Sequence, residues 1–170
     1  LFISTKLAAE IKDYDGAVAA IDESLAKMSL DYVDLMLIHS PQPWSDFRGG
    51  DYSEGNREAW RALEDAYKAG KIRSIGVSKF LEADLENILD SATVAPHVNQ
   101  LLVHVGNTPS ELISFCDSKG ILVEAYSPIA QGEMLKNQQV KAIADKYNVS
   151  IPQLCIRYTI QLGTVSLPKT

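Results

Sequence analysis

The chain has 170 residues, of which 46% are hydrophobic, and its 22 acidic and 16 basic side chains leave a formal net charge of -6 at pH 7. That length and apolar fraction suffice for one sizeable core, while the negative charge argues against nucleic acid or an anionic membrane surface as a partner. Because no apolar run is long enough to span a bilayer and no signal peptide is visible, we expect a cytoplasmic protein with no membrane partner.

Strand-like and helix-like segments alternate along the chain. Short runs rich in β-forming residues predict strands at 1–6, 33–39, 72–77, 97–101, 121–126 and 164–168. Apolar residues at helical spacing predict helices at about 15–28, 55–69, 81–90, 109–119, 136–147 and 151–162. Residues 40–54, which contain two prolines and a Gly-Gly pair, are expected to form a loop.

Start and stop signals support these helices. Asp15 is expected to be the N-cap of the first helix. Thr108-Pro109-Ser110-Glu111 and Ser150 with Gln153 have the pattern of capping boxes. Gly70 and Gly120 are expected to end the helices that precede them.

Strict alternation of strands and helices favours a parallel sheet with crossover helices. No Gly-x-Gly-x-x-Gly motif follows any strand, which argues against a dinucleotide-binding Rossmann unit and favours an α/β fold of the (β/α)8 TIM-barrel type. A full barrel has eight strands and about 250 residues. We therefore expect residues 1–170 to form a single domain that holds six of the strands, with the first two strands and the C-terminal end missing.

Six polar residues stand at the predicted carboxyl ends of these strands, where TIM barrels carry their chemistry. They are Lys6, His39, Ser78, Gln100, Tyr126 and Lys169. Each alone has a simpler explanation, such as a solvated strand end, a structural histidine, a loop cap or core packing. Their occurrence at every strand end favours one active-site rim.

The two cysteines, Cys116 and Cys155, lie in predicted helices without the spacing of metal ligands. We expect both to be reduced thiols in the core, and we expect no metal site.

Several stretches resemble the aldo-keto reductase family, in order and over nearly the whole chain. They are STKL (4–7), DLMLIHSP (34–41), LEDAYKAGKIRSIGVSKF (63–80), HVNQ (97–100), FCDSKGILVEAYSPIAQGEML (115–135) and SLPKT (166–170). The resemblance implies a TIM barrel that reduces the carbonyl group of a small molecule with NADPH, acting as a monomer or weak oligomer.

The family uses an Asp, Tyr, Lys and His tetrad, and the resemblance assigns Lys6 and His39 to the last two roles. The tyrosine, a general acid with an unperturbed pKa of about 10, and the aspartate belong to upstream segments that these residues do not contain. A nearby ammonium lowers the pKa of such a tyrosine, and His39 would orient the substrate carbonyl. The 170 residues alone are therefore expected to be inactive.

The resemblance also implies a cofactor site. It assigns Ser78, Lys79 and Gln100 to the nicotinamide carboxamide, Tyr126 to stacking on the nicotinamide ring, and Ser127, Pro128 and Ile129 to the pyrophosphate. Lys169 and Thr170 would hold the 2′-phosphate of NADPH.

The chain departs from the family pattern at Lys79, where asparagine is usual, and at Ser40, where many members have tryptophan. Lysine can donate to the carboxamide oxygen but cannot accept from its NH2 group. Two alternatives stay open: a cofactor-binding regulatory subunit without turnover, and a TIM-barrel lyase or isomerase that uses the amine of Lys6.

Overall fold

The computed structural model describes residues 1–169. The chain divides into two compact units, an N-terminal unit of residues Leu1–Asn99 and a C-terminal unit of residues Gln100–Thr170. The six strands follow one another in the sheet in the order β1-β2-β3-β4-β5-β6, which is also their order in the sequence. That topology confirms the predicted α/β fold with one crossover between successive strands. The single domain that we expected stays a prediction.

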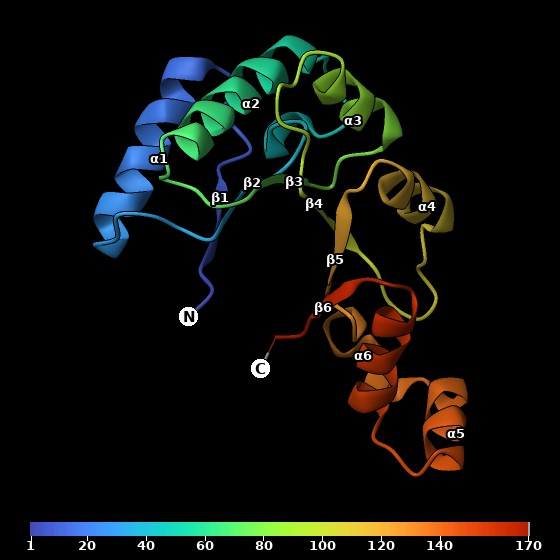
Figure 1. Ribbon diagram of the computed structural model, residues 1–170. Coiled ribbons are helices and arrows are strands. Elements are labelled where there is room, and N and C mark those ends of the chain that lie inside the picture. Colours follow the sequence, from blue (N-terminus) through green and yellow to red (C-terminus); the bar gives the residue numbers. More distant parts are fainter. Residues whose placement is uncertain (170) are drawn as a thin grey trace. The chain divides into compact units, whose positions relative to one another are not determined.

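In the N-terminal unit, β1 (Ser4–Leu7), β2 (Leu35–Ile38) and β3 (Ile75–Ser78) are parallel. All four residues of β2 and of β3 are buried, as expected for parallel strands covered on both faces. The helices α1 (Tyr14–Met28) and α2 (Ser53–Lys68) lie side by side over these strands (Figure 1). The short helix α3 (Glu82–Leu89) follows β3.

The core of this unit requires a glycine in β3. A Cβ atom on Gly76 would lie 2.5 Å from the carbonyl oxygen of Val98 and 2.7 Å from a methyl carbon of Leu37. Both distances are shorter than van der Waals contact, so only glycine allows β3 to pack this closely. Val98 begins β4 (Val98–Leu102), which ends in the C-terminal unit.

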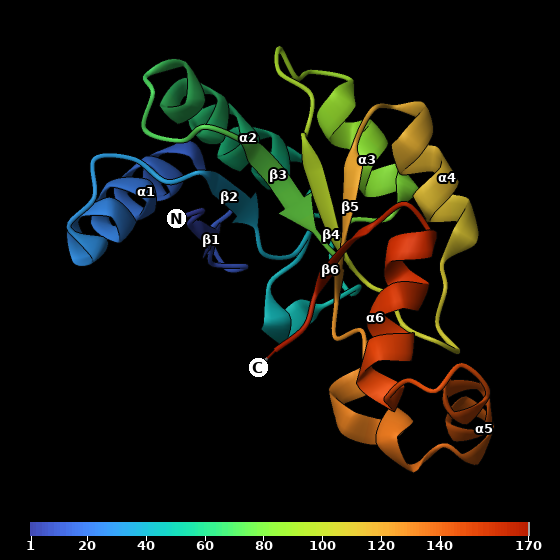
Figure 2. The same cartoon turned by 60° about the horizontal axis from the view of Figure 1, so that its bottom comes forward.

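The C-terminal unit contains α4 (Ser110–Ser118), β5 (Leu122–Tyr126), α5 (Gln138–Lys146), α6 (Ile151–Gln161) and β6 (Val165–Leu167). Strands β5 and β6 are parallel, with Tyr126 opposite Leu167. Helix α4 packs along β5 and α6 along β6 (Figure 2). A kinked 3-10 segment, Ala130–Lys136, connects β5 to α5 and was not predicted.

Two of the predicted caps are wrong. The N-cap of α1 is Asp13, whose Oδ1 accepts a hydrogen bond of 2.7 Å from the amide of Gly16, and Asp15 lies within the first turn. The box at Thr108 does not form, because Pro109 occupies the N-cap position of α4 and the hydroxyl of Thr108 bonds that of Tyr158 instead.

The other predicted helix start and stop signals are confirmed. Ser150 and Gln153 exchange the two hydrogen bonds of a capping box at the start of α6. Gly70 and Gly120 follow their helices with φ of 78° and 69°, a conformation that favours glycine.

Cys116 and Cys155 are buried thiols. Within residues 1–169 no helix is both long and apolar enough to cross a bilayer.

Candidate functional site

In the N-terminal unit the strand register brings three predicted site residues to one edge of the sheet. Leu7 pairs with Ile38, and Ile38 pairs with Val77. Lys6 therefore lies just before this level, whereas His39 and Ser78 follow it directly. The amide of His39 donates a hydrogen bond of 3.1 Å to the carbonyl of Leu7, which fixes the start of the loop after β2 against β1.

Positive charge gathers at this edge. Burial lowers the pKa of His39 most, and the neighbouring ammonium groups of Lys79 and Lys6 lower it further, against a small opposing effect of Glu10. Burial and the charge of Lys6 also lower the pKa of Lys79. The three side chains are thus close enough to interact electrostatically. These interactions and burial keep His39 in its neutral form near pH 7.

An aromatic side chain that the sequence analysis did not single out covers the histidine. Trp44, in the short 3-10 turn Trp44–Asp46 of the loop after β2, packs edge-on against His39 with ring centroids 5.0 Å apart. The Nζ of Lys79 lies 5.2 Å from the centroid of the Trp44 ring. The only signal in the sequence was an aromatic residue in a loop after a strand that ends in histidine.

Lys79 has a strained backbone with φ of 63°. The guanidinium of Arg48 supports it by donating a hydrogen bond of 2.9 Å to its carbonyl oxygen while pairing with Asp84 at 2.7 Å. A left-handed conformation at a non-glycine residue costs about 1–3 kcal/mol and recurs at functional sites. The asparagine that is usual here in the family tolerates this conformation better than lysine does.

In the C-terminal unit, Gln100 is buried in β4 and donates a hydrogen bond of 2.8 Å to Oε2 of Glu124 in β5, which is also buried. Glu124 was not among the predicted site residues, although a carboxylate inside an apolar strand was a usable signal. This bond occupies one NH of the amide and fixes the orientation of the Gln100 side chain.

The other predicted residues of this unit surround one pocket. Its volume is about 720 Å³, and it is lined by Tyr126, Ser127, Pro128, Ile129, Gln131, Leu167 and Lys169. Five of these seven residues are among the predicted cofactor contacts. Burial raises the pKa of Tyr126, so its hydroxyl stays protonated near neutral pH. The volume lies in the range of about 300–1,000 Å³ that is typical of small-molecule sites.

The loop beside this pocket is strained. Ser127, Ala130 and Gln131 all have positive φ, between 48° and 53°. Two short turns, from the amide of Ala130 to Ser127 and from that of Gly132 to Ile129, hold this backbone. Such a concentration of left-handed residues next to a pocket is typical of a ligand-binding loop.

The whole chain, residues 1–170, matches the model of the aldo/keto reductase family. The chain belongs to the aldo/keto reductase family. It is 41% identical over 170 residues to the glyoxal reductase of Bacillus subtilis (strain 168), covering all of this chain and 58% of that protein.

Solved structures of the family agree. An aldo-keto reductase from a Medee basin deep-sea metagenome library superposes with a TM-score of 0.90 at 34% identity, and this chain covers 60% of it. An aldo-keto reductase of Bombyx mori in complex with NADP gives a TM-score of 0.85 at 36% identity, with 58% of that chain covered. In both comparisons all of the present chain is matched, so it spans about three fifths of the length of these relatives.

Within this aldo/keto reductase chain the predicted site residues fall into two groups. Lys6, His39, Ser78 and Lys79 gather at one edge of the N-terminal unit. Tyr126, Ser127, Pro128, Ile129 and Lys169 surround the pocket of the C-terminal unit, and Gln100 lies in the same unit, bonded to Glu124. Thr170 lies outside the described residues. The roles of all these residues stay predictions.

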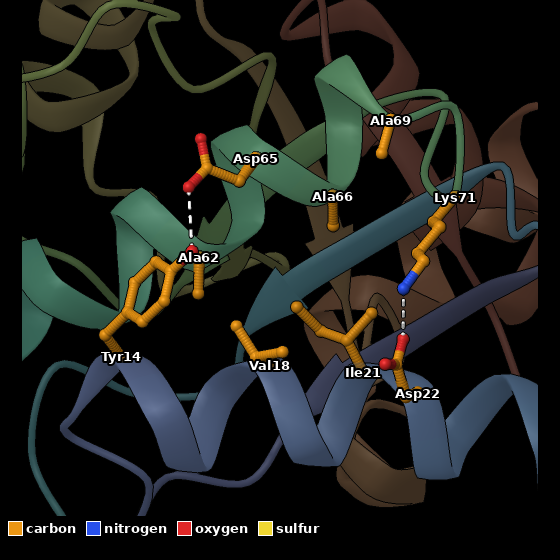
Figure 3. A pocket seen from close by; sticks show the side chains of 9 residues that line it. All are labelled: Tyr14, Val18, Ile21, Asp22, Ala62, Asp65, Ala66, Ala69 and Lys71. Atoms are coloured by element: carbon orange, nitrogen blue, oxygen red, sulfur yellow. Dashed lines mark hydrogen bonds and ion pairs between the residues drawn. The ribbon is translucent and has the colours of Figure 1, made fainter.

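Another hollow of the N-terminal unit is separate from the residues predicted for the site. It lies between α1 and α2, is bridged by Tyr14–Asp65 and Lys71–Asp22 hydrogen bonds of 2.9 and 2.6 Å, and contains none of the predicted site residues (Figure 3). Among residues 1–169 no cluster of three or more His, Cys, Asp or Glu side chains could hold a metal ion.

Proposed function

We propose that the full-length protein reduces aldehydes or ketones to alcohols with NADPH. The observation that carries the proposal is the group of Lys6, His39 and Lys79 at the carboxyl edge of β1–β3. There the charges of Lys79 and Lys6 lower the pKa of His39, and the charge of Lys6 lowers the pKa of Lys79. We also propose that it acts in the cytoplasm on a small-molecule carbonyl, as a monomer or weak oligomer, in an eight-stranded barrel that other segments complete.

The residues of the C-terminal unit suit a nicotinamide dinucleotide. Tyr126 offers an aromatic ring, Ser127 a hydroxyl and Lys169 a cation around one pocket. These groups match a flat ring, a pyrophosphate and a 2′-phosphate in turn. When bound, NADPH would supply the hydride for the carbonyl carbon. The relative from Bombyx mori, whose structure contains NADP, supports the choice of cofactor.

His39 would donate a hydrogen bond to the substrate carbonyl, and Lys6 would act on the pKa of the general acid. Burial and two ammonium groups keep the imidazole of His39 neutral, so that it can donate one hydrogen bond to the substrate carbonyl without carrying charge into the site. Lys6 would lower the pKa of the tyrosine general acid, which the family resemblance places outside these residues. Trp44, which packs edge-on against His39, would limit the access of water to one side of the imidazole.

The test is turnover of NADPH by the full-length protein with a panel of aldehydes and ketones. Glyoxal comes first, because a relative 41% identical to this chain is named a glyoxal reductase. We expect loss of NADPH absorbance that depends on the carbonyl compound, with the alcohol as product. Tight NADPH binding without turnover on any substrate would instead indicate a regulatory subunit. Trapping of a carbonyl compound on Lys6 by borohydride would indicate Schiff-base chemistry.

A further inference from the structure

A half-buried lysine outside the predicted site holds the loop that follows His39. Lys12 lies between β1 and α1, and its Nζ donates hydrogen bonds of 2.8 Å to the carbonyl oxygen of Ser40 and of 2.9 Å to Oδ1 of Asn56. Ser40 is the residue directly after the histidine and is fully buried. A side chain from the loop after β1 thus reaches the backbone of the loop after β2.

Asn56 completes the arrangement from a third element. It lies in the first turns of α2, is only 3% exposed, and its Nδ2 donates a hydrogen bond of 2.8 Å to the carbonyl of Pro41. The carbonyl groups of two consecutive residues, Ser40 and Pro41, are therefore each held by a side chain. Those two side chains also bond each other. We call Lys12 and Asn56 the loop clamp.

The approach of the three elements depends on glycine at position 55. A Cβ atom there would lie 2.6 Å from the carbonyl oxygen and 2.7 Å from the Cβ of Lys12. A side chain at this position would force the backbone of Lys12 to move away from α2. The clamp is thus built into the backbone path as well as into the side chains.

The burial of this ammonium has a cost. Desolvation lowers the pKa of Lys12 to about 8, although the charges of Glu10 and Asp84 act in the opposite direction. A partly buried cation is poor support for packing alone, because an apolar side chain of similar size would avoid the desolvation penalty. What the ammonium adds is a charge-assisted, directional bond to one carbonyl oxygen.

The segment that the clamp holds carries the groups beside the substrate position. His39 stands before the clamped carbonyls, and Trp44, which packs on its ring at a centroid distance of 5.0 Å, stands after them. We propose that Lys12 and Asn56 are positioning residues that fix the His39 imidazole and the Trp44 ring for carbonyl reduction. This inference rests on the proposed function, and neither residue touches the reacting atoms in it.

The first test is kinetic, in the full-length protein. Lys12→Met and Asn56→Ala remove the clamp from two different elements, and Lys27→Met removes an exposed lysine of α1 that pairs with Glu23 as a control. We expect each clamp variant to lower kcat by about tenfold or more, with the NADPH dissociation constant within about twofold of wild type. The control should keep the wild-type kcat.

A double-mutant cycle separates positioning from general destabilisation. If the clamp acts through His39, then Lys12→Met should cost little more in a His39→Ala background, because the group it positions is already gone. Additive losses in the two variants, or loss of kcat in step with the thermal midpoint, would overturn the proposal.

A second readout needs no turnover. Amide hydrogen exchange should become faster in the segment from Ser40 to Phe47 of both clamp variants, and should stay at the wild-type rate there in Lys27→Met. Unchanged exchange in this segment would overturn the clamp whether or not the protein is a reductase. Faster exchange in a protein that reduces no carbonyl would keep the loop contact but refute its place in catalysis and the proposed function together.

Discussion

The two groups of candidate site residues differ in charge and in how they are held. In the N-terminal unit Lys6, His39 and Lys79 share one edge, and positive neighbours lower the pKa of the last two. In the C-terminal unit the pocket walls are Tyr126, Ser127, Pro128 and Ile129, with Lys169 as the one cation among its lining residues.

We infer that the two groups have different functions, one in protonation and the other in ligand binding. A cluster of interacting titratable groups tunes protonation, since each charge shifts the pKa of the next. A pocket of uncharged side chains with one cation suits a large, mostly flat ligand and can bind one negative group on it. We therefore expect substitutions in the N-terminal unit to change the rate of the chemical step and those in the C-terminal unit to change cofactor affinity.

The largest effect should come from Lys6→Met. Removal of the ammonium takes away the charge that would lower the pKa of the general acid, so kcat should fall by about 100-fold or more. NADPH binding, measured by quenching of protein fluorescence, should stay at the wild-type level. Near-normal turnover would show that the tetrad assignment is wrong, and weaker binding of NADPH would show that the division of work is wrong.

A smaller effect, on cofactor affinity and not on kcat, is expected for Lys169→Ala. The loss of a charge-assisted hydrogen bond worth about 1.5–3 kcal/mol should weaken NADPH binding by about 10- to 150-fold. NADH has no 2′-phosphate, and its affinity should stay unchanged. Lys141→Ala, which removes an exposed lysine paired with Asp145 in α5, is the matched control. Equal losses for both dinucleotides would refute the 2′-phosphate role.

The order of elements was predictable because each one depends on local signals. Buried parallel strands such as β2 appear as continuous apolar runs, and Gly70 ends its helix through its own backbone freedom. The misplaced caps show where local signals are ambiguous. Asp13 and Asp15 are both suitable N-cap residues, and only the backbone path after β1 decides between them.

The placement of candidate residues was predictable at the strand ends. It was not predictable where loops from different elements meet. Lys6 and His39 follow from the rule that barrel chemistry lies at the carboxyl ends of strands. Trp44 and the Lys12–Asn56 contact depend on the path of two loops and on the close approach at Gly55. Sequence spacing carries no information on such contacts, because Lys12 and Asn56 are 44 residues apart.

The smallest effect is expected for the pKa of His39 when Lys79 is replaced. Lys79→Asn restores the residue that is usual in the family and removes a cation that lowers the pKa of His39. The imidazolium of His39 then meets less repulsion, so its pKa should rise toward the ordinary value. Since the neutral imidazole is the proposed donor, the fall of kcat on acidification should move to higher pH in this variant.

The measurement is a titration of the His39 ring signals by NMR, with His97 and His104 as reference signals, beside the pH profile of kcat. Lys27→Asn, on the exposed face of α1, should leave both curves in place. If the His39 titration does not move in Lys79→Asn, the Lys79 ammonium does not act on the histidine. The set of interacting titratable side chains in the N-terminal unit would then reduce to Lys6 and His39, and Lys79 would keep only its predicted role at the cofactor carboxamide.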